Sequence, residues 1–192
     1  MKIAIIGGGH GCYAAAADLS EQGHEIRFWR RDADALAPIK QSGALGLIDA
    51  AGERLVPLHC VTNDVAEALE GAELVLSPLP ATAQDGVART IAPHLVDGQV
   101  LFIPPGTFGA LTMSRIIRQM GNQADLAFVE AGTLPYLARL RGEDVVAISA
   151  RTTRLPSGVY PARHTDHALA IVAKAFPAVE PLSDALDAAL MN

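Results

Sequence analysis

A run of glycines near the amino terminus is the feature of this sequence best suited to binding chemistry. The segment Gly7-Gly8-Gly9-His10-Gly11-Cys12 follows a short apolar run and precedes an alanine-rich stretch. Its spacing approximates the G-x-G-x-x-G fingerprint, in which Gly7 makes the tight turn and Gly9 lets the backbone approach a pyrophosphate. N–H groups and the dipole at the start of the next helix attract the anion. The segment therefore predicts a dinucleotide-binding turn, with His10 and Gly11 beside the cofactor.

The third fingerprint position holds Cys12, where glycine usually lets the helix pack closely on the strand. We interpret Cys12 as a small packing residue; the alternative is a thiol activated at the helix N-terminus. The two cysteines form no C-x-x-C pair, and no histidine has metal-ligand spacing, so we predict no metal site. The cysteine usage also favours a reducing, cytoplasmic compartment.

The end of the second predicted strand distinguishes between two dinucleotides. NAD-binding units usually carry an acidic residue there for the ribose 2′-hydroxyl. This chain has Arg30-Arg31 after Trp29 instead. A guanidinium suits a 2′-phosphate and leaves the 2′-hydroxyl without its usual partner. We therefore predict NADP as the cofactor; in the alternative, both arginines are solvated and Asp32 serves NAD.

Three further loops follow predicted strands, and ligands of open α/β sheets bind outside the carboxyl ends of the strands. The candidates beside the cofactor are Pro78, Leu79, Pro80 and Gly106. Those on the substrate side are Glu130, Thr133, Tyr136 and Arg139, since a charge at a strand end is expected to face the crevice. Ordinary turn chemistry is the alternative explanation, because Pro and Gly are common in loops.

The elements that must position these residues alternate along the chain. Apolar runs predict strands, and amphipathic or alanine-rich segments predict helices. The predicted strands are 2–6, 25–29, 73–77, 99–103, 126–130, 144–149 and one that starts at 158–161. The predicted helices are 10–22, 32–41, 64–69, 81–95, 108–120, 166–176 and 184–190. A hairpin at 44–48 and 54–58 interrupts the alternation. This pattern predicts an α/β fold: a doubly wound, mostly parallel Rossmann sheet with a β-hairpin insertion after the second helix.

The amino-acid composition and net charge limit the kinds of molecule that this protein is expected to bind. The chain has 192 residues, 50% of them hydrophobic and 19% charged, and a formal net charge of −6. Without a basic run, this charge argues against nucleic-acid binding. No apolar run reaches the roughly 18 residues of a membrane span, so we expect no membrane contact. A small-molecule ligand is the remaining expectation.

The order of these parts resembles the N-terminal domain of the octopine/nopaline (opine) dehydrogenases. The matching pieces are residues 3–11, the hairpin, and residues 71–76, 104–107 and 130–136. The resemblance implies that NAD(P)H reduces an imine formed between an amino acid and a 2-oxo acid. It also implies a catalytic histidine in an all-helical second domain, and no residue here matches it, so the catalytic residues stay unknown. We therefore expect an NAD(P)-binding Rossmann domain at 1–182, with 183–192 beginning a helix that leads to the missing domain.

Two other functions stay open. Similar N-terminal halves occur in ketopantoate reductase and glycerol-3-phosphate dehydrogenase, whose chemistry would need a lysine-centred site. None of Lys2, Lys40 and Lys174 falls at a predicted crevice strand end. A nucleotide-sensing domain without catalysis is the second alternative, supported by the missing acid–base residue. Apolar surface left by an incomplete crevice would also permit a homodimer.

Overall fold

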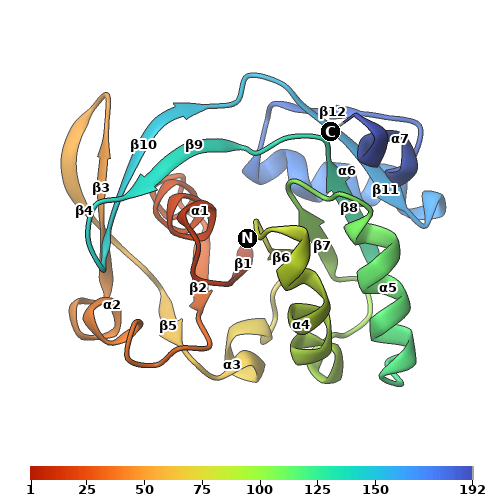
Figure 1. Cartoon of the computed structure of the whole chain (residues 1–192), viewed down its shortest axis with the longest axis horizontal. Helices are drawn as coiled ribbons and strands as arrows, with labels where there is room; N and C mark the ends of the chain where they lie inside the picture. Colours follow the sequence, from red (N-terminus) through yellow and green to blue (C-terminus); the bar gives the residue numbers. More distant parts are fainter. Residues whose placement is uncertain (192) are drawn as a thin grey trace.

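The computed structural model describes residues 1–191, which form two sheets around a central helix (Figure 1). The main sheet has eight strands in the order β12-β11-β8-β7-β6-β1-β2-β5. These strands are β1 (Lys2–Ile6), β2 (Glu25–Trp29), β5 (Cys60–Thr62), β6 (Leu74–Leu76), β7 (Val100–Ile103), β8 (Ala127–Ala131), β11 (Leu155–Tyr160) and β12 (Val179–Pro181). Neighbours from β5 to β8 run parallel, and β11 is antiparallel to β8. The predicted doubly wound, mostly parallel sheet is confirmed.

Helices cover both faces of the main sheet because its strands are apolar on both sides. In β1, Ile3 and Ile5 join one hydrophobic cluster, and Ala4 and Ile6 join the other. The helices α1 (His10–Glu21), α2 (Ala37–Ser42) and α6 (Thr165–Ala175) lie on the first side. On the second side are α3 (Val65–Leu69), α4 (Ala81–Ile91), α5 (Gly109–Gln119) and α7 (Ala185–Leu190). The chain leaves β1 toward β2 and returns to β6 on its other side, which makes the carboxyl end of β1 a topological switch point.

A second sheet lies across α1. Its order is β4-β3-β10-β9, from β3 (Ala44–Asp49), β4 (Gly52–Pro57), β9 (Tyr136–Leu140) and β10 (Val145–Arg151). The hairpin predicted from the sequence is therefore present as β3 and β4. The strand β9 was not predicted, and neither was the pairing that joins β10 to β3 across about a hundred residues.

Helix α1 is packed between the two sheets (Figure 1). Residues 12–19 are all buried, and four consecutive alanines, Ala14 to Ala17, occupy the middle of this stretch. Small side chains let both sheets approach the helix axis, so the alanine run serves packing as well as helix propensity. Its buried carboxylate, Asp18, accepts hydrogen bonds from Tyr136 Oη at 3.0 Å and Arg151 Nε at 2.6 Å. These contacts tie α1 to the second sheet.

The segment after β2 differs from the prediction. A helix was expected from Asp32, but α2 begins at Ala37. The Asp32 carboxylate accepts from the N–H groups of Asp34 and Ala35, both at 3.1 Å, and so forms a separate turn. Pro38 then lies in the first turn of α2, where its missing N–H costs nothing. Similarly, the helix predicted at 81–95 ends at Ile91 and continues as a 3₁₀ turn, Ala92–His94.

Among residues 1–191, no helix combines the length and the apolar character needed to span a membrane. The same residues contain no group of three or more His, Cys, Asp or Glu side chains arranged to hold a metal ion.

Candidate dinucleotide-binding site

Close contacts explain why the turn after β1 consists of glycines. Gly7 has a φ of 126°, which disfavours other residues, and a Cβ there would come within 2.8 Å of the Leu79 side chain. At Gly8, a Cβ would come within 2.7 Å of Arg30 Nε. A Cβ at Gly9 would meet nothing closer than Leu79 at 3.8 Å. Leu79 and Arg30 thus pack closely against Gly7 and Gly8, whereas the backbone at Gly9 stays accessible to a ligand.

The start of α1, which follows this turn, has no side-chain cap. Gly9 is its N-cap and offers no side-chain acceptor to the first N–H groups of the helix. These groups and the helix dipole are the features that bind a pyrophosphate. The structure places Gly7, Gly9, His10 and Gly11 at the junction of β1 and α1, where the sequence analysis expects them.

Cys12 packs behind the turn rather than facing the ligand side. Its side chain is fully buried, and its thiol lies 3.7 Å from the carbonyl oxygen of Ile6. Burial raises the pKa of the Cys12 thiol to about 12, because the thiolate would be poorly solvated there. This environment supports the packing interpretation and gives no support to an activated thiol.

A cavity of about 390 Å³ opens on one side of the glycine turn. Its lining comprises Gly7, Gly8, Trp29, Arg30, Arg31, Asp32, Leu79, Thr82, Ala83, Gly86 and Val87. Arg30 lies across Gly8 and donates through Nη1 to Tyr13 Oη at 2.7 Å. Arg31 is exposed and lies near α4, with its Nη2 3.7 Å from where a Cβ on Gly86 would be. Both predicted arginines therefore line this cavity.

A second cavity, of about 430 Å³, lies on the other side of the turn. Its lining comprises Gly9, His10, Gly11, Pro78, Leu79, Pro80, Pro105, Leu134, Tyr136, Leu137, Ala138 and Arg139. Leu79 belongs to both linings, so the two cavities are neighbours along the switch point, and we refer to them together as the crevice. His10 Nδ1 accepts from the Leu140 N–H at 2.8 Å, a bond that holds β9 beside the glycine turn. The crevice thus has one wall from each sheet.

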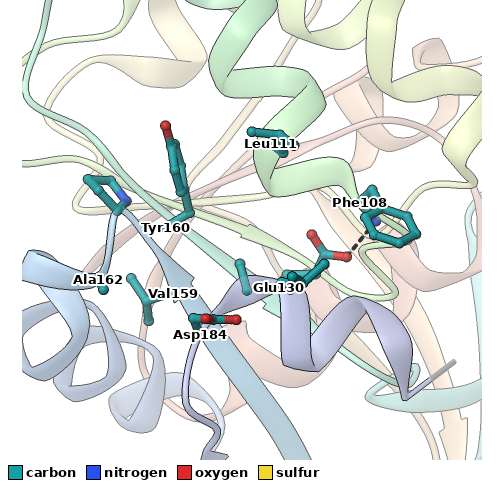
Figure 2. Close-up of a pocket in the computed structure, with 10 residues that line it drawn as sticks. Phe108, Leu111, Glu130, Val159, Tyr160, Ala162 and Asp184 are labelled. Carbon is teal, nitrogen blue, oxygen red and sulfur yellow. Dashed lines mark hydrogen bonds between the residues drawn. The ribbon is translucent and has the colours of Figure 1, made fainter.

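The loop after β7 is shaped by an acid at the end of β8. Glu130 is 1% exposed, and its carboxylate accepts from Phe108 N at 2.6 Å and from Ala110 N at 2.9 Å. Figure 2 shows this carboxylate directed toward Phe108. A Cβ on Gly106 would overlap the Glu130 side chain, and the Gly106 carbonyl accepts from Gln84 Nε2 at 2.8 Å. Burial raises the pKa of Glu130, while the two N–H groups oppose that shift.

The four substrate-side candidates do not share one location. Arg139 and Tyr136 line the crevice, but the Tyr136 ring is 7% exposed and its hydroxyl donates to Asp18. The expectation that the Glu130 charge faces the crevice is wrong, because this carboxylate is turned to the start of α5. Thr133 is exposed and lies outside the lining of both cavities. Arg139 is exposed and donates to the neighbouring Ala138 carbonyl at 2.8 Å.

Several residues of the site carry no recognisable signal in the sequence. Gln84 is buried on α4 and reaches the loop after β7, a contact that joins residues 22 positions apart. Ser77, at the carboxyl end of β6, is 3% exposed, and its hydroxyl has no hydrogen-bond partner among the described residues. Both residues are recognised as part of the site only from their position near the switch point, and that position is known only once the sheet has been described.

The parallel sheet, the glycine turn at its switch point and the crevice beside it define a Rossmann-type dinucleotide-binding domain. The chain belongs to the family described as the N-terminus of NAD-dependent glycerol-3-phosphate dehydrogenase, which matches residues 2–130. The described residues fit an NAD(P)-type cofactor: Gly9 leaves the backbone accessible, and the crevice extends to both sides of it.

Relatives in the opine dehydrogenase group match more of the chain. An opine dehydrogenase of Arthrobacter sp. (strain 1C) is 27% identical over 98% of this chain and 53% of its own length. An octopine dehydrogenase structure with NADH and L-arginine has a TM-score of 0.81 at 21% identity, covering 97% of this chain and 49% of its own. Yersinopine dehydrogenase with NADP⁺ bound has a TM-score of 0.71 at 16% identity, covering 98% and 49%. The resemblance to the N-terminal domain of opine dehydrogenases is confirmed, and the chain spans about half the length of these relatives.

Proposed function

We propose that this chain is the cofactor-binding domain of an opine-type dehydrogenase that prefers NADP. The observation that carries the cofactor preference is the cavity beside Gly8, where Arg30 and Arg31 meet at the end of β2. Asp32, the residue that would otherwise serve the ribose of NAD, already accepts two backbone N–H groups through Oδ1. Two guanidinium groups favour a 2′-phosphate over a 2′-hydroxyl.

The nicotinamide is assigned to the other cavity, between Pro78–Pro80, Pro105 and β9. This cavity is mostly apolar, which excludes water from a reduced nicotinamide. The bound cofactor supplies the hydride; the residues of this chain hold the pyrophosphate at α1 and position the ring against the loop after β7. Arg139, exposed on the same wall, offers a cation to a substrate carboxylate.

The proposed reaction is the reductive condensation of an amino acid with a 2-oxo acid. It is supported by the similarity to the Arthrobacter opine dehydrogenase over nearly the whole chain. The alternative of a lysine-centred reductase is less well supported, because none of Lys2, Lys40 and Lys174 lines either part of the crevice. The catalytic acid–base group stays unassigned among the described residues.

Two measurements test this function separately. Titration with NADPH and NADH, followed by protein fluorescence, reports cofactor binding and is expected to favour NADPH. Oxidation of NADPH in the presence of pyruvate and a panel of amino acids then reports turnover, with glycerol phosphate and ketopantoate as comparison substrates. A preference for NADH would overturn the NADP assignment. Binding with little turnover is the expected result, because no described residue is assigned the role of catalytic acid–base group; robust turnover by this chain alone would contradict that.

Two further proposals concern the cellular location and the oligomeric state of the protein. We propose a cytoplasmic location, because Cys12 and Cys60 are both free thiols. A homodimer is a further proposal, which sedimentation of the purified protein would test; a single species of monomer mass would contradict it.

A further inference from the structure

A groove on the flank of the domain carries an unusual concentration of arginines. It has a volume of about 400 Å³ and lies between the second half of α5, the start of β8 and the 3₁₀ turn η2 (Ala162–His164). Its lining comprises Leu111, Ser114, Arg115, Arg118, Leu126, Phe128, Tyr160, Pro161 and Arg163. We call it the arginine groove.

The positive charge of the arginine groove is only partly neutralised. The Arg115 side chain forms no hydrogen bond or ion pair with any described residue. Arg118 donates to neutral oxygens, the Asn122 carbonyl at 3.2 Å and Gln123 Oε1 at 3.5 Å. Arg163 pairs with Asp125 at 2.6 Å. In a chain with a net charge of −6, three guanidinium groups around one groove and one paired carboxylate form a local anion-attracting site.

Apolar surface lies next to these charges. Leu126 and Phe128 are buried at the floor, whereas Leu111 is 57% and Tyr160 42% exposed. A neighbouring cavity of about 380 Å³ shares Leu111, Tyr160 and Pro161 with the arginine groove and is otherwise largely apolar. Figure 2 shows that Tyr160 extends away from Glu130, at the end of that cavity remote from Phe108. The two hollows therefore join an apolar surface to a cationic one.

The arginine groove is separate from the dinucleotide crevice. None of its lining residues lines either cavity beside the glycine turn. Helix α5 begins at the loop after β7 and runs away from the crevice, so Arg115 and Arg118 lie toward its far end. Phe128 lies at the beginning of β8 and Leu126 just before it, at the end of the strands opposite to the switch point. Figure 1 shows α5 on the flank of the molecule away from the second sheet.

We propose that the arginine groove binds a small soluble organic dianion with a compact apolar body. The head group, a phosphate or a similar dianion, lies between Arg115 and Arg118, which donate charge-assisted hydrogen bonds to it. The apolar body packs against Leu111 and Tyr160 and covers their exposed surfaces. The unpaired side chain of Arg115 favours this occupant, because Arg163 is the one of the three arginines that is paired with a carboxylate among the described residues.

Isothermal titration of the purified protein with phenyl phosphate tests the proposal. Saturable binding at a single site is expected, with weaker binding of inorganic phosphate and of phenol. Replacing both cations (Arg115→Gln with Arg118→Gln) is expected to weaken binding by about tenfold or more, since each removes a charge-assisted hydrogen bond. The matched control is Arg154→Gln, an exposed arginine that pairs with Glu180 and lies just before β11, at the end of that strand opposite to Tyr160. This control should bind phenyl phosphate as the unmodified protein does.

Each other outcome would overturn the proposal. Equal losses in the Arg154 control would mean that binding follows net charge rather than the groove. Equal affinity for inorganic phosphate would remove the role of Leu111 and Tyr160. Binding to anionic vesicles without binding to phenyl phosphate would indicate a lipid surface as the occupant. NADPH titration of the double variant should be unchanged, so failure of this site is distinguishable from failure of the cofactor assignment.

Discussion

The side chain of Glu130 lies directly against Gly106, so closely that Gly106 has no room for a Cβ. From this position the Glu130 carboxylate accepts from the N–H groups of Phe108 and Ala110. Thr107 and Phe108, the two residues after Gly106, have φ values of 52° and 65°, in the left-handed region that non-glycine residues rarely adopt. A buried acid at the end of one strand therefore fixes the loop after the neighbouring strand, on the crevice side of the sheet.

Replacing Gly106 with alanine is expected to destabilise the protein by about 1–3 kcal/mol, because the added methyl group must displace a buried side chain. Urea unfolding followed by circular dichroism measures this change. The matched control is Gly142→Ala, at a position where a Cβ would meet no atom within 4 Å. We expect the control to unfold near the midpoint of the unmodified protein; equal stability of both variants would contradict the described packing.

Replacing Glu130 with alanine is expected to cost about 2–4 kcal/mol, because two charge-assisted hydrogen bonds are lost and two N–H groups keep no acceptor. Glu130→Gln should have an intermediate effect, since one amide oxygen can serve one of those N–H groups. NADPH affinity should fall with stability in both variants if the loop after β7 contacts the cofactor. A Gln variant less stable than the Ala variant would be inconsistent with this hydrogen bonding.

The Glu130 carboxyl group also predicts how the free energy of unfolding depends on pH. Burial raises the pKa of Glu130 above its ordinary value of 4.5, so the folded state holds this proton more tightly than the unfolded state. Its contribution to stability is greatest below pH 4.5 and is lost as the pH rises through the folded pKa. The free energy of unfolding of the unmodified protein, relative to Glu130→Gln, should therefore decrease as the pH is raised from 4 to 7. An increase over that interval would mean that the two N–H groups outweigh burial.

Local patterns determined which parts of this fold could be predicted. The apolar run before Gly7 and the alanine run after it lie within twenty residues, and both are read directly. The second sheet was not predicted because β10 pairs with β3 across about a hundred residues. In addition, β9 has only five residues, too few for a clear alternating pattern. The contact of Arg30 with Gly8 and that of Glu130 with Gly106 likewise join distant positions. The type of residue at a strand end was visible; the direction of its side chain was not.

The positions of Arg30 and Arg31 predict how single substitutions at these residues change the affinities for NADPH and NADH. Arg31→Ala is expected to weaken NADPH binding by about tenfold, through loss of one charge-assisted contact with the 2′-phosphate, and to leave NADH binding nearly unchanged. Arg30→Ala should weaken both, because Arg30 also packs on Gly8 and bonds Tyr13. The control is Arg89→Ala, an exposed arginine on α4 paired with Asp85. An Arg31 variant that loses NADH and NADPH equally would refute a 2′-phosphate contact.

Cys12 predicts a protected thiol. Its pKa of about 12 leaves almost no thiolate at pH 8, and its complete burial blocks access, whereas Cys60 is half-buried. In a Cys60→Ser variant, an aromatic disulfide reagent at pH 8 should label no thiol in the folded protein on the timescale of minutes. One thiol should react at once after unfolding in urea, which provides the internal control. Rapid labelling of the folded variant would instead support an activated thiol at the start of α1, and would exclude the packing role that the contact with Ile6 indicates.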